Sequence, residues 1–178
     1  MVTPGGGEDG YLLVKTYLQG QEFLKENQPH IKSLVFCGPE MPTEHKQELY
    51  QIAANYPQVE FREFSNDLMS YVSAADAVVS MGGYNTVCEI LSAAKPAVIV
   101  PRIKPSEEQL IRSRRMDNLG LLKSIHPESL TPQALMMQLF QVLENSGKPT
   151  NIDLDGLSRV TRQIRNLLAD KITANQTK

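Results

Sequence analysis

The sequence predicts an α/β fold built on a doubly wound parallel sheet with helices on both faces. Short runs of continuous apolar residues alternate along the chain with amphipathic segments, and glycine-rich loops follow two of the runs. Strands that are buried on both faces give such runs, as in the parallel sheets that helices cover. The 178 residues are enough for one domain with a sizeable core.

The apolar runs give the expected strands. They are Ser33–Cys37 (SLVFC), Val59–Phe64, Ala77–Met81 (AVVSM) and Ala97–Val100 (AVIV). At the start of the chain, Met1–Pro4 leads straight into Gly5, which leaves only a stub where a first strand is expected. Because a strand usually needs about five residues, we expect this chain to be a fragment that begins inside or just after its first strand.

Amphipathic segments and capping residues give the expected helices. They are Tyr11–Lys25, Thr43–Ala54, Asp67–Ala74, Thr86–Ala94, Glu107–Leu119, Thr131–Leu143 and Asp155–Lys171. Thr43 and Asp155 are of the residue types that cap helices at the N-terminus, and Gly120 ends its helix. Lys148–Asp153 is expected to be a linker before the last helix.

Composition and charge exclude several classes of protein. A net charge of −2 gives no bulk attraction to nucleic acid or to an anionic membrane, so any phosphate site must be local. No stretch approaches the roughly 20 apolar residues that span a bilayer, and no signal-peptide pattern opens the chain. Cys37 and Cys88 lie in apolar runs and are expected to be reduced core thiols of a cytoplasmic protein. The histidines are scattered without metal-ligand spacing, so no metal site is expected.

Two glycine-rich loops follow strands, GGGEDG from Gly5 and GGYN from Gly82. Ligands of doubly wound sheets bind at the carboxyl ends of strands, where glycines let the backbone approach a ligand and a helix N-terminus attracts phosphate. The alternative is that these glycines only make tight strand-to-helix turns. Two such loops at one edge favour a diphosphate held between them, although Glu8 and Asp9 direct the first loop towards a sugar or an acceptor.

Glu89 is an acidic residue in a predicted helix that is otherwise apolar or small. A carboxylate there needs a partner or water. It lies about one turn, roughly 5 Å, beyond the helix start, which suits the ribose hydroxyls of a nucleotide whose diphosphate sits at that start. The alternative is an acidic residue that the helix dipole favours in the first turn.

The segment from Phe64 to Gln109, which contains DAVVSMGGYNTVCEILSAAKPAVIVPRIKPSEEQ, resembles the C-terminal donor-binding domain of GT-B glycosyltransferases. It is most similar to the family 28 group of bacterial enzymes that act on the peptidoglycan lipid precursor, and the resemblance runs from Gly5 to about Gly120. It implies a Rossmann-like domain, the C-terminal half of a GT-B fold. Residues 1–150 would then bind the donor and residues 151–178 form the linker and C-terminal helix, with the N-terminal acceptor domain outside this chain.

The resemblance implies a role for each matching residue. Gly82 and Gly83, with the backbone at Tyr84, Asn85 and Thr86, would bind the diphosphate, and Glu89 would bind the ribose. The main chain of Phe64 and Ser65 would hold the base, and Glu108 and Gln109 would contact the sugar hydroxyls. Gly5, Gly6 and Gly7 would face the cleft between the two domains.

The sequence departs from the family pattern at two positions. Met81 stands where the lipid-precursor enzymes carry a basic residue, and the two-glutamate pattern of retaining families is therefore absent, which favours an inverting transfer. Glu108 replaces a glutamine, so the sugar need not be N-acetylglucosamine.

A second interpretation exists for the residues before and within the helix from Glu107. Ser106–Gln109 also fits a capping box, in which Gln109 reaches back to the cap, and both interpretations stay open. Arg112, Arg114 and Arg115 form a basic cluster on this helix. It is expected to be a solvated face, or to lie near the acceptor or the partner domain.

Together these features predict the donor-binding domain of an inverting, metal-independent glycosyltransferase that transfers a hexose-type sugar from a UDP-sugar to an unknown acceptor. No cofactor beyond the nucleotide sugar is expected, and no catalytic base is found, so the fragment should bind nucleotide without turnover. The expected partners are the donor, the acceptor and the N-terminal domain, with no nucleic acid. The full enzyme is expected to be cytoplasmic and peripheral at the inner membrane. Alternatives are a nucleotide-sugar epimerase or hydrolase of the same fold, and a non-catalytic nucleotide-binding module.

Overall fold

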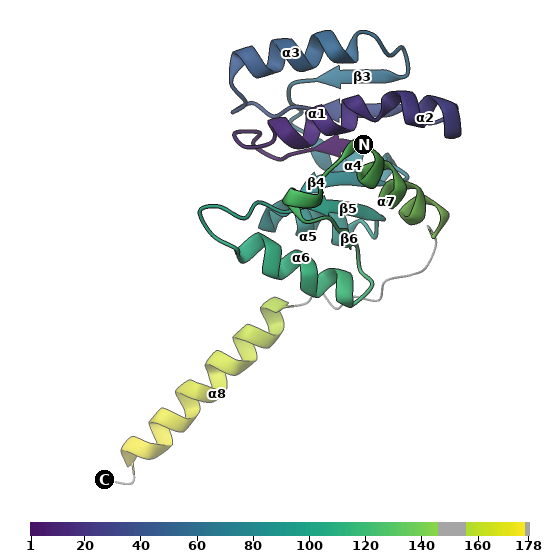
Figure 1. Ribbon diagram of the computed structural model, residues 1–178. Coiled ribbons are helices and arrows are strands. Elements are labelled where there is room, and N and C mark those ends of the chain that lie inside the picture. Colours follow the sequence, from purple (N-terminus) through teal and green to yellow (C-terminus); the bar gives the residue numbers. More distant parts are fainter. Residues whose placement is uncertain (146–155, 177–178) are drawn as a thin grey trace.

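A computed structural model describes residues 1–145 and 156–176, and it contains one parallel sheet. The strands are β1 (Val2–Thr3), β2 (Ser33–Phe36), β3 (Val59–Arg62), β4 (Val78–Met81), β5 (Ala97–Val100) and β6 (Lys123–Ser124). They form a six-stranded sheet in the order β3-β2-β1-β4-β5-β6, and every neighbouring pair is parallel (Figure 1). This confirms the predicted doubly wound sheet, whose strand order reverses between β1 and β4.

Strand β1, the expected stub, lies in the middle of the sheet although it has only two residues. Val2 pairs with Val35 of β2 on one side and with Val79 of β4 on the other. The Ser80 hydroxyl donates a hydrogen bond of 2.6 Å to the Thr3 carbonyl oxygen, and this contact is buried. The stub thus joins the two halves of the sheet.

Helices cover both faces of the sheet, as predicted. They are α1 (Tyr11–Gln19), α2 (Gln21–Asn27), α3 (Thr43–Ala53), α4 (Leu68–Ala74), α5 (Tyr84–Ser92), α6 (Glu108–Asn118), the 3-10 turn Pro127–Ser129, α7 (Pro132–Glu144) and α8 (Gly156–Gln176). Alternate strand residues point to opposite faces, so Val79 and Val98 pack in a core with α1, α2, α3 and α7. Val78 and Ile99 pack in a second core with α4 and α5.

The predicted helix Tyr11–Lys25 is wrong in one respect, because the structure divides it at Gly20 into α1 and α2. A Cβ at Gly20 would lie 2.4 Å from the Met136 Cε of α7. The close approach of α7 therefore accounts for a glycine at this point, and the local sequence pattern did not show it.

Two predicted helix starts are also wrong. Thr43 is the first residue of α3 and does not cap it, since Pro42 holds the cap position. Helix α5 begins at Tyr84, two residues before the predicted Thr86, with Gly83 in the cap position. The predicted linker Lys148–Asp153, the boundary at residue 150 and the Asp155 cap lie outside the described residues.

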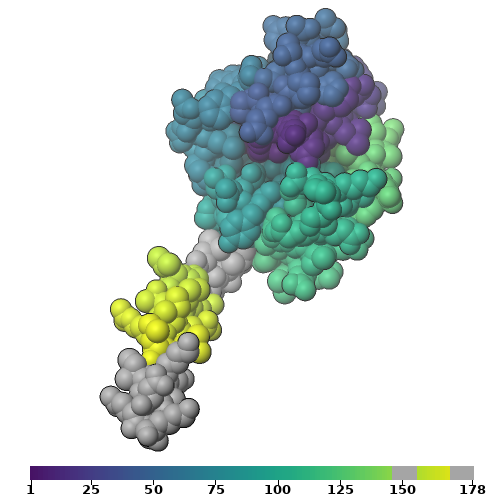
Figure 2. Space-filling view, turned by 90° about the vertical axis from the view of Figure 1, so that its left-hand side faces the viewer, coloured from purple at the N-terminus to yellow at the C-terminus, as the bar shows by residue number. Residues whose placement is uncertain are grey.

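Helix α8 extends away from the body of the domain in both views (Figures 1 and 2). Its side chains from Gly156 to Leu168 are exposed, and they include Leu157, Val160, Ile164, Leu167 and Leu168. The apolar residues recur at helical spacing on one face of this helix. In the described part of the chain, no helix combines the length and the apolar character that crossing a membrane requires.

We predict that a chain ending after Asn145 keeps the thermal unfolding midpoint of the full chain, because the described side chains of α8 bury nothing against the domain. Scanning calorimetry of the two proteins measures this. A chain ending after Leu130 is the matched control: it lacks α7, whose Leu135 and Met136 are both 0% exposed, and it should not unfold cooperatively. A large drop in midpoint for the first truncation would place α8 within the folding unit.

Candidate functional site

A cleft of about 270 Å³ opens at the carboxyl ends of β1 and β4, where the strand order reverses. Its lining residues come from the loops after β1, β2, β4 and β5, from the end of β4 and from the first turns of α5 and α6: Pro4, Gly5, Gly6, Gly7, Glu8, Asp9, Glu40, Met81, Gly83, Tyr84, Asn85, Thr86, Arg102 and Gln109. This is the position at which doubly wound sheets bind ligands. A larger hollow of about 780 Å³ lies at the opposite, amino ends of the strands, and none of the predicted site residues lines it.

The two glycine loops face each other across this cleft, as the sequence predicted. A Cβ at Gly5 would lie 3.6 Å from the Thr86 hydroxyl oxygen, and a Cβ at Gly83 would lie 3.9 Å from the same oxygen. The Thr86 hydroxyl therefore lies between the loops. Gly7 has a φ of +98°, and a Cβ there would lie 2.3 Å from the Cys37 carbonyl oxygen, so its glycine serves the packing of this loop on the one after β2.

The N-terminus of α5 opens into the cleft without a side-chain cap. The first hydrogen bond of the helix runs from the Val87 N–H to the Gly83 carbonyl oxygen at 3.0 Å. The N–H groups of Tyr84, Asn85 and Thr86 precede it and have no partner within the helix. These donors and the positive end of the helix dipole make the β4 side of the cleft attractive to an anion.

Charged side chains divide the cleft into two unlike walls. Glu8, Asp9 and Glu40 supply carboxylates on the side of the first loop, and α5 supplies N–H donors on the other side. Arg102, from the loop after β5, places its Nη1 atom 3.3 Å from the Asp9 Oδ2 atom, with both side chains 43% exposed. The sequence analysis missed Arg102 and Glu40, although each follows an expected strand closely enough to be found at this edge.

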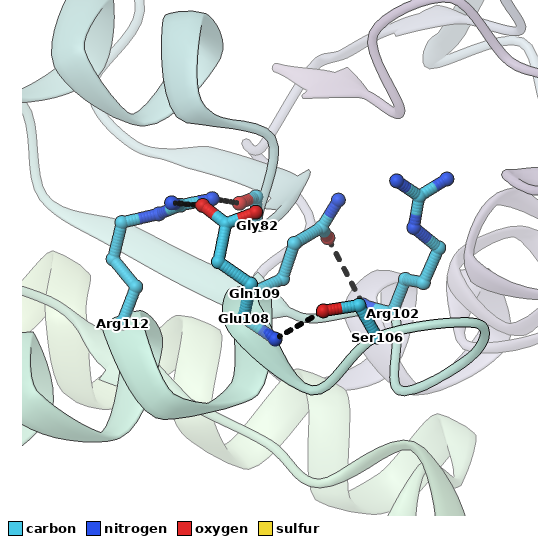
Figure 3. Close-up of polar contacts among 6 residues, drawn as sticks. All are labelled: Gly82, Arg102, Ser106, Glu108, Gln109 and Arg112. Atoms are coloured by element: carbon cyan, nitrogen blue, oxygen red, sulfur yellow. Dashed lines mark hydrogen bonds and ion pairs between the residues drawn. The ribbon is translucent and has the colours of Figure 1, made fainter.

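Gln109 and Glu108, the expected sugar-binding pair, take different directions (Figure 3). The Gln109 Oε1 atom accepts a hydrogen bond of 3.1 Å from the Arg102 N–H, and Gln109 lines the cleft. The Ser106 hydroxyl oxygen accepts one of 3.2 Å from the Glu108 N–H. The predicted capping box is therefore wrong, because Gln109 does not reach back to Ser106.

Glu108 does not line the cleft and forms an ion pair with Arg112, one turn along α6 (Figure 3). Its side chain is 69% exposed, whereas that of Arg112 is only 15% exposed. The Arg112 Nη2 atom donates a hydrogen bond of 2.6 Å to the Gly82 carbonyl oxygen. The expectation of a solvated helix face is therefore wrong for Arg112 and holds for the exposed Arg114 and Arg115. The alternative, that the cluster lies near the acceptor or the partner domain, stays a prediction.

Other predicted site residues lie outside the lining of the cleft. Gly82 is the buried residue of the Gly82-Gly83 turn. Phe64, which is 58% exposed, and Ser65 follow the edge strand β3. Glu89 is half-buried, and its carboxylate has no hydrogen-bond or ion-pair partner among the described residues. Because α5 begins at Tyr84, Glu89 lies about 7.5 Å along the helix from its start.

Neither cysteine offers a nucleophile to the cleft. Cys37 is a buried free thiol, as predicted, and burial raises its pKa, so the thiol stays protonated at neutral pH. Cys88 is also free but only half-buried, on α5. In residues 1–145 and 156–176 no three histidine, cysteine or acidic side chains converge to hold a metal ion.

Comparison with known proteins agrees with this geometry. Residues 2–162 match the glycosyltransferase family 28 C-terminal domain. The chain belongs to this family. It is 28% identical over 171 residues to the UDP-N-acetylglucosamine--N-acetylmuramyl-(pentapeptide) pyrophosphoryl-undecaprenol N-acetylglucosamine transferase of Glaesserella parasuis, covering 96% of this chain and 47% of that enzyme. The enzyme of the same name from Shouchella clausii is 30% identical over 112 residues, 62% of this chain and 30% of that enzyme.

Solved structures show the same fold. MurG of Acinetobacter baumannii superposes with a TM-score of 0.64 at 22% identity, over 82% of this chain and 40% of that one. A glycosyltransferase of kitacinnamycin gives a TM-score of 0.59 at 18% identity, over 80% of this chain and 34% of that one. The domain therefore has the fold of GT-B glycosyltransferases, and it spans less than half the length of these relatives.

We predict that Gly7→Ala destabilises the domain by about 2 kcal/mol or more, because the left-handed φ and the Cys37 carbonyl leave no room for a Cβ. Gly83→Ala is the matched control in the facing loop, where the nearest atom would be 3.9 Å away, and it should change stability by less than about 1 kcal/mol. Urea unfolding followed by circular dichroism measures both. Equal losses in the two variants would contradict the packing that we assign to the first loop.

Proposed function

We propose that this domain binds a nucleotide diphosphate sugar and that the diphosphate lies at the N-terminus of α5. The observation that carries the proposal is the uncapped first turn of α5, which opens into the cleft where the strand order reverses. Free N–H donors, the helix dipole and the close backbone approach at Gly83 all favour a phosphate at this place. The Thr86 hydroxyl adds a donor between the loops.

The ribose and the base would extend from the diphosphate along α5 and β3. Glu89 is half-buried without a partner, and a carboxylate in that state is suited to two neighbouring hydroxyls. Its distance along the helix, about 7.5 Å from the first residue, leaves room for the diphosphate and the start of the ribose. The main chain at Phe64 and Ser65 also follows the carboxyl end of a strand, β3, and we assign it to the base.

The sugar would lie towards the first loop. Gln109 lines the cleft and Arg102 stands beside it, held by the Arg102 N–H and Gln109 Oε1 contact of 3.1 Å. The carboxylates of Glu8, Asp9 and Glu40 on this wall suit hydroxyl groups and oppose a second phosphate. We therefore place the hexose-type sugar between Gln109 and the loop Gly5–Gly7.

The reaction that we propose is an inverting transfer from a UDP-sugar without a metal ion. Relatives of the family are named as UDP-N-acetylglucosamine transferases, and this supports uridine in the donor. The positive end of α5 would stabilise the departing UDP, and Met81 stands where a second glutamate would mark a retaining enzyme. We expect the base to come from an acceptor domain and this chain alone to show no turnover.

The names of the same relatives also suggest the class of acceptor and its location. Their names give a pyrophosphoryl-undecaprenol acceptor, which is a lipid-linked molecule at a membrane surface. We propose an acceptor presented in this way to a cytoplasmic enzyme that is peripheral at the membrane. The exposed apolar face of α8 is suited to contact with an acceptor domain.

We predict that UDP binds this domain more tightly than 2′-deoxy-UDP and that Glu89→Ala removes the preference. Loss of the ribose contacts should weaken UDP about tenfold or more, since a hydrogen bond to a charged group is worth about 1.5–3 kcal/mol. It should weaken 2′-deoxy-UDP less, because that nucleotide has only the 3′ hydroxyl to lose. Isothermal titration calorimetry of the two nucleotides against both proteins measures this.

Glu44→Ala is the control, since Glu44 is an exposed acidic residue in the first turn of α3. It should bind both nucleotides like the unmodified protein. If neither nucleotide binds at millimolar concentration, the proposed function is wrong. If both bind and Glu89→Ala keeps the preference for UDP, only the ribose assignment is lost.

A further inference from the structure

Arg112 of α6 is unusual for an arginine because most of its side chain is buried. Its side chain is 15% exposed and its Nε atom is buried without a hydrogen-bond partner among the described residues. The hydroxyl of Ser113, beside it on α6, is also buried without a partner there. Buried polar atoms of this kind are uncommon and cost stability, so stability alone does not account for this arrangement.

The guanidinium contacts the glycine turn, α5 and α6. Nη2 donates to the Gly82 carbonyl oxygen at 2.6 Å, and Nη1 pairs with Glu108 (Figure 3). The Arg112 Cζ atom lies 5.5 Å from the centre of the Tyr84 ring. Arginine can make such forked contacts because its donors lie in one rigid plane, and it can stack on an aromatic face at the same time.

The contact with Gly82 fixes the direction of the next N–H. The Gly82-Gly83 peptide is trans, since the cis peptide of the described chain is Lys104-Pro105. In a planar trans peptide the N–H points opposite to the carbonyl. With the Gly82 carbonyl held towards α6, the Gly83 N–H points away from α6, and Gly83 lines the cleft.

Close packing holds the turn and α6 together as one unit. A Cβ at Gly82 would lie 3.1 Å from the Gln109 Cβ, 3.1 Å from the Ser113 hydroxyl oxygen and 3.2 Å from the Pro101 Cβ. The turn therefore lies directly on α6, next to the residue that donates to the Gly82 carbonyl oxygen.

We propose that Arg112 is a positioning residue for nucleotide binding, which holds the Gly82-Gly83 turn open to the diphosphate and keeps Glu108 away from the donor sugar. This inference rests on the proposed function and deepens it. Glu108 precedes Arg112 by one turn, the favourable order for an ion pair on a helix, so its carboxylate completes the support of the turn. Of the expected sugar-binding pair, only Gln109 remains to contact the sugar.

The test is calorimetric titration of UDP and UDP-N-acetylglucosamine against Arg112→Met, Arg112→Lys and Glu108→Gln. Arg112→Met should weaken both ligands by the same factor, about tenfold or more, because the orientation of the turn is lost. Arg112→Lys should recover part of the affinity, since one ammonium can still donate to the Gly82 carbonyl but cannot form the fork. Glu108→Gln should weaken both ligands equally and less than Arg112→Met.

Arg114→Met is the matched control, an exposed arginine of the same helix, and it should bind like the unmodified protein. The amide resonances of Gly83 and Tyr84 in the ligand-free protein add a direct readout: they should shift in Arg112→Met and stay in place in Arg114→Met.

Three results overturn the inference. Full affinity in Arg112→Met together with a lower unfolding midpoint would make Arg112 structural only. A changed ratio of the two affinities in Glu108→Gln would show that Glu108 contacts the sugar. If the unmodified protein binds neither ligand, the proposed function falls together with this inference, whereas the first two results leave the proposed function standing.

Discussion

Strand β1 lies between β2 and β4 and pairs with both, although it contains only Val2 and Thr3. The chain leaves β1 for α1 on one face of the sheet, and it leaves β4 for α5 on the other face. The loops after these two strands therefore separate, and the cleft opens between them. The buried hydrogen bond of 2.6 Å from the Ser80 hydroxyl to the Thr3 carbonyl fixes the two strands at this point. The placement of every group in the cleft depends on this pairing.

The two sides of the cleft are supported differently. The turn at Gly82 lies on α6, where it accepts a part-buried hydrogen bond from Arg112 and packs closely beside Ser113. The first loop is linked across the cleft by the Arg102 and Asp9 pair, whose side chains are 43% exposed, and such a pair contributes less than about 1 kcal/mol. The side that we assign to the diphosphate is thus fixed by contacts of a side chain with the turn. On the other side the loop backbone is closely packed at Gly7, and the exposed side chains of Arg102 and Asp9 can adjust to a ligand.

The sequence predicted the strands and helix starts that depend on neighbouring residues. The run Ala97–Val100 is a strand with the predicted ends, and α7 begins at Pro132 with its predicted start at Thr131, because apolar runs and helix starts depend on neighbouring residues. The division at Gly20 and the contact from Arg112 to Gly82, 30 residues earlier, depend on packing between distant segments. The glycine loops could be placed at one edge because a parallel sheet leaves no other place for them. The roles of Glu89, Phe64 and Ser65 stay predictions.

The distribution of charge in the cleft also gives a bound donor its direction. Glu8, Asp9 and Glu40 repel a diphosphate from the first loop, and the open N–H groups of α5 attract it to the other wall. A nucleotide sugar has its two negative charges at the centre and neutral groups at both ends, so a neutral end faces the carboxylates when the other wall holds the diphosphate. Our assignment of the ribose to Glu89 on α5 makes that end the sugar. Arg102 stands between these walls, paired with Asp9 and hydrogen-bonded through its backbone to Gln109. Arg102 therefore links the first loop to Gln109, the residue that we assign to the sugar.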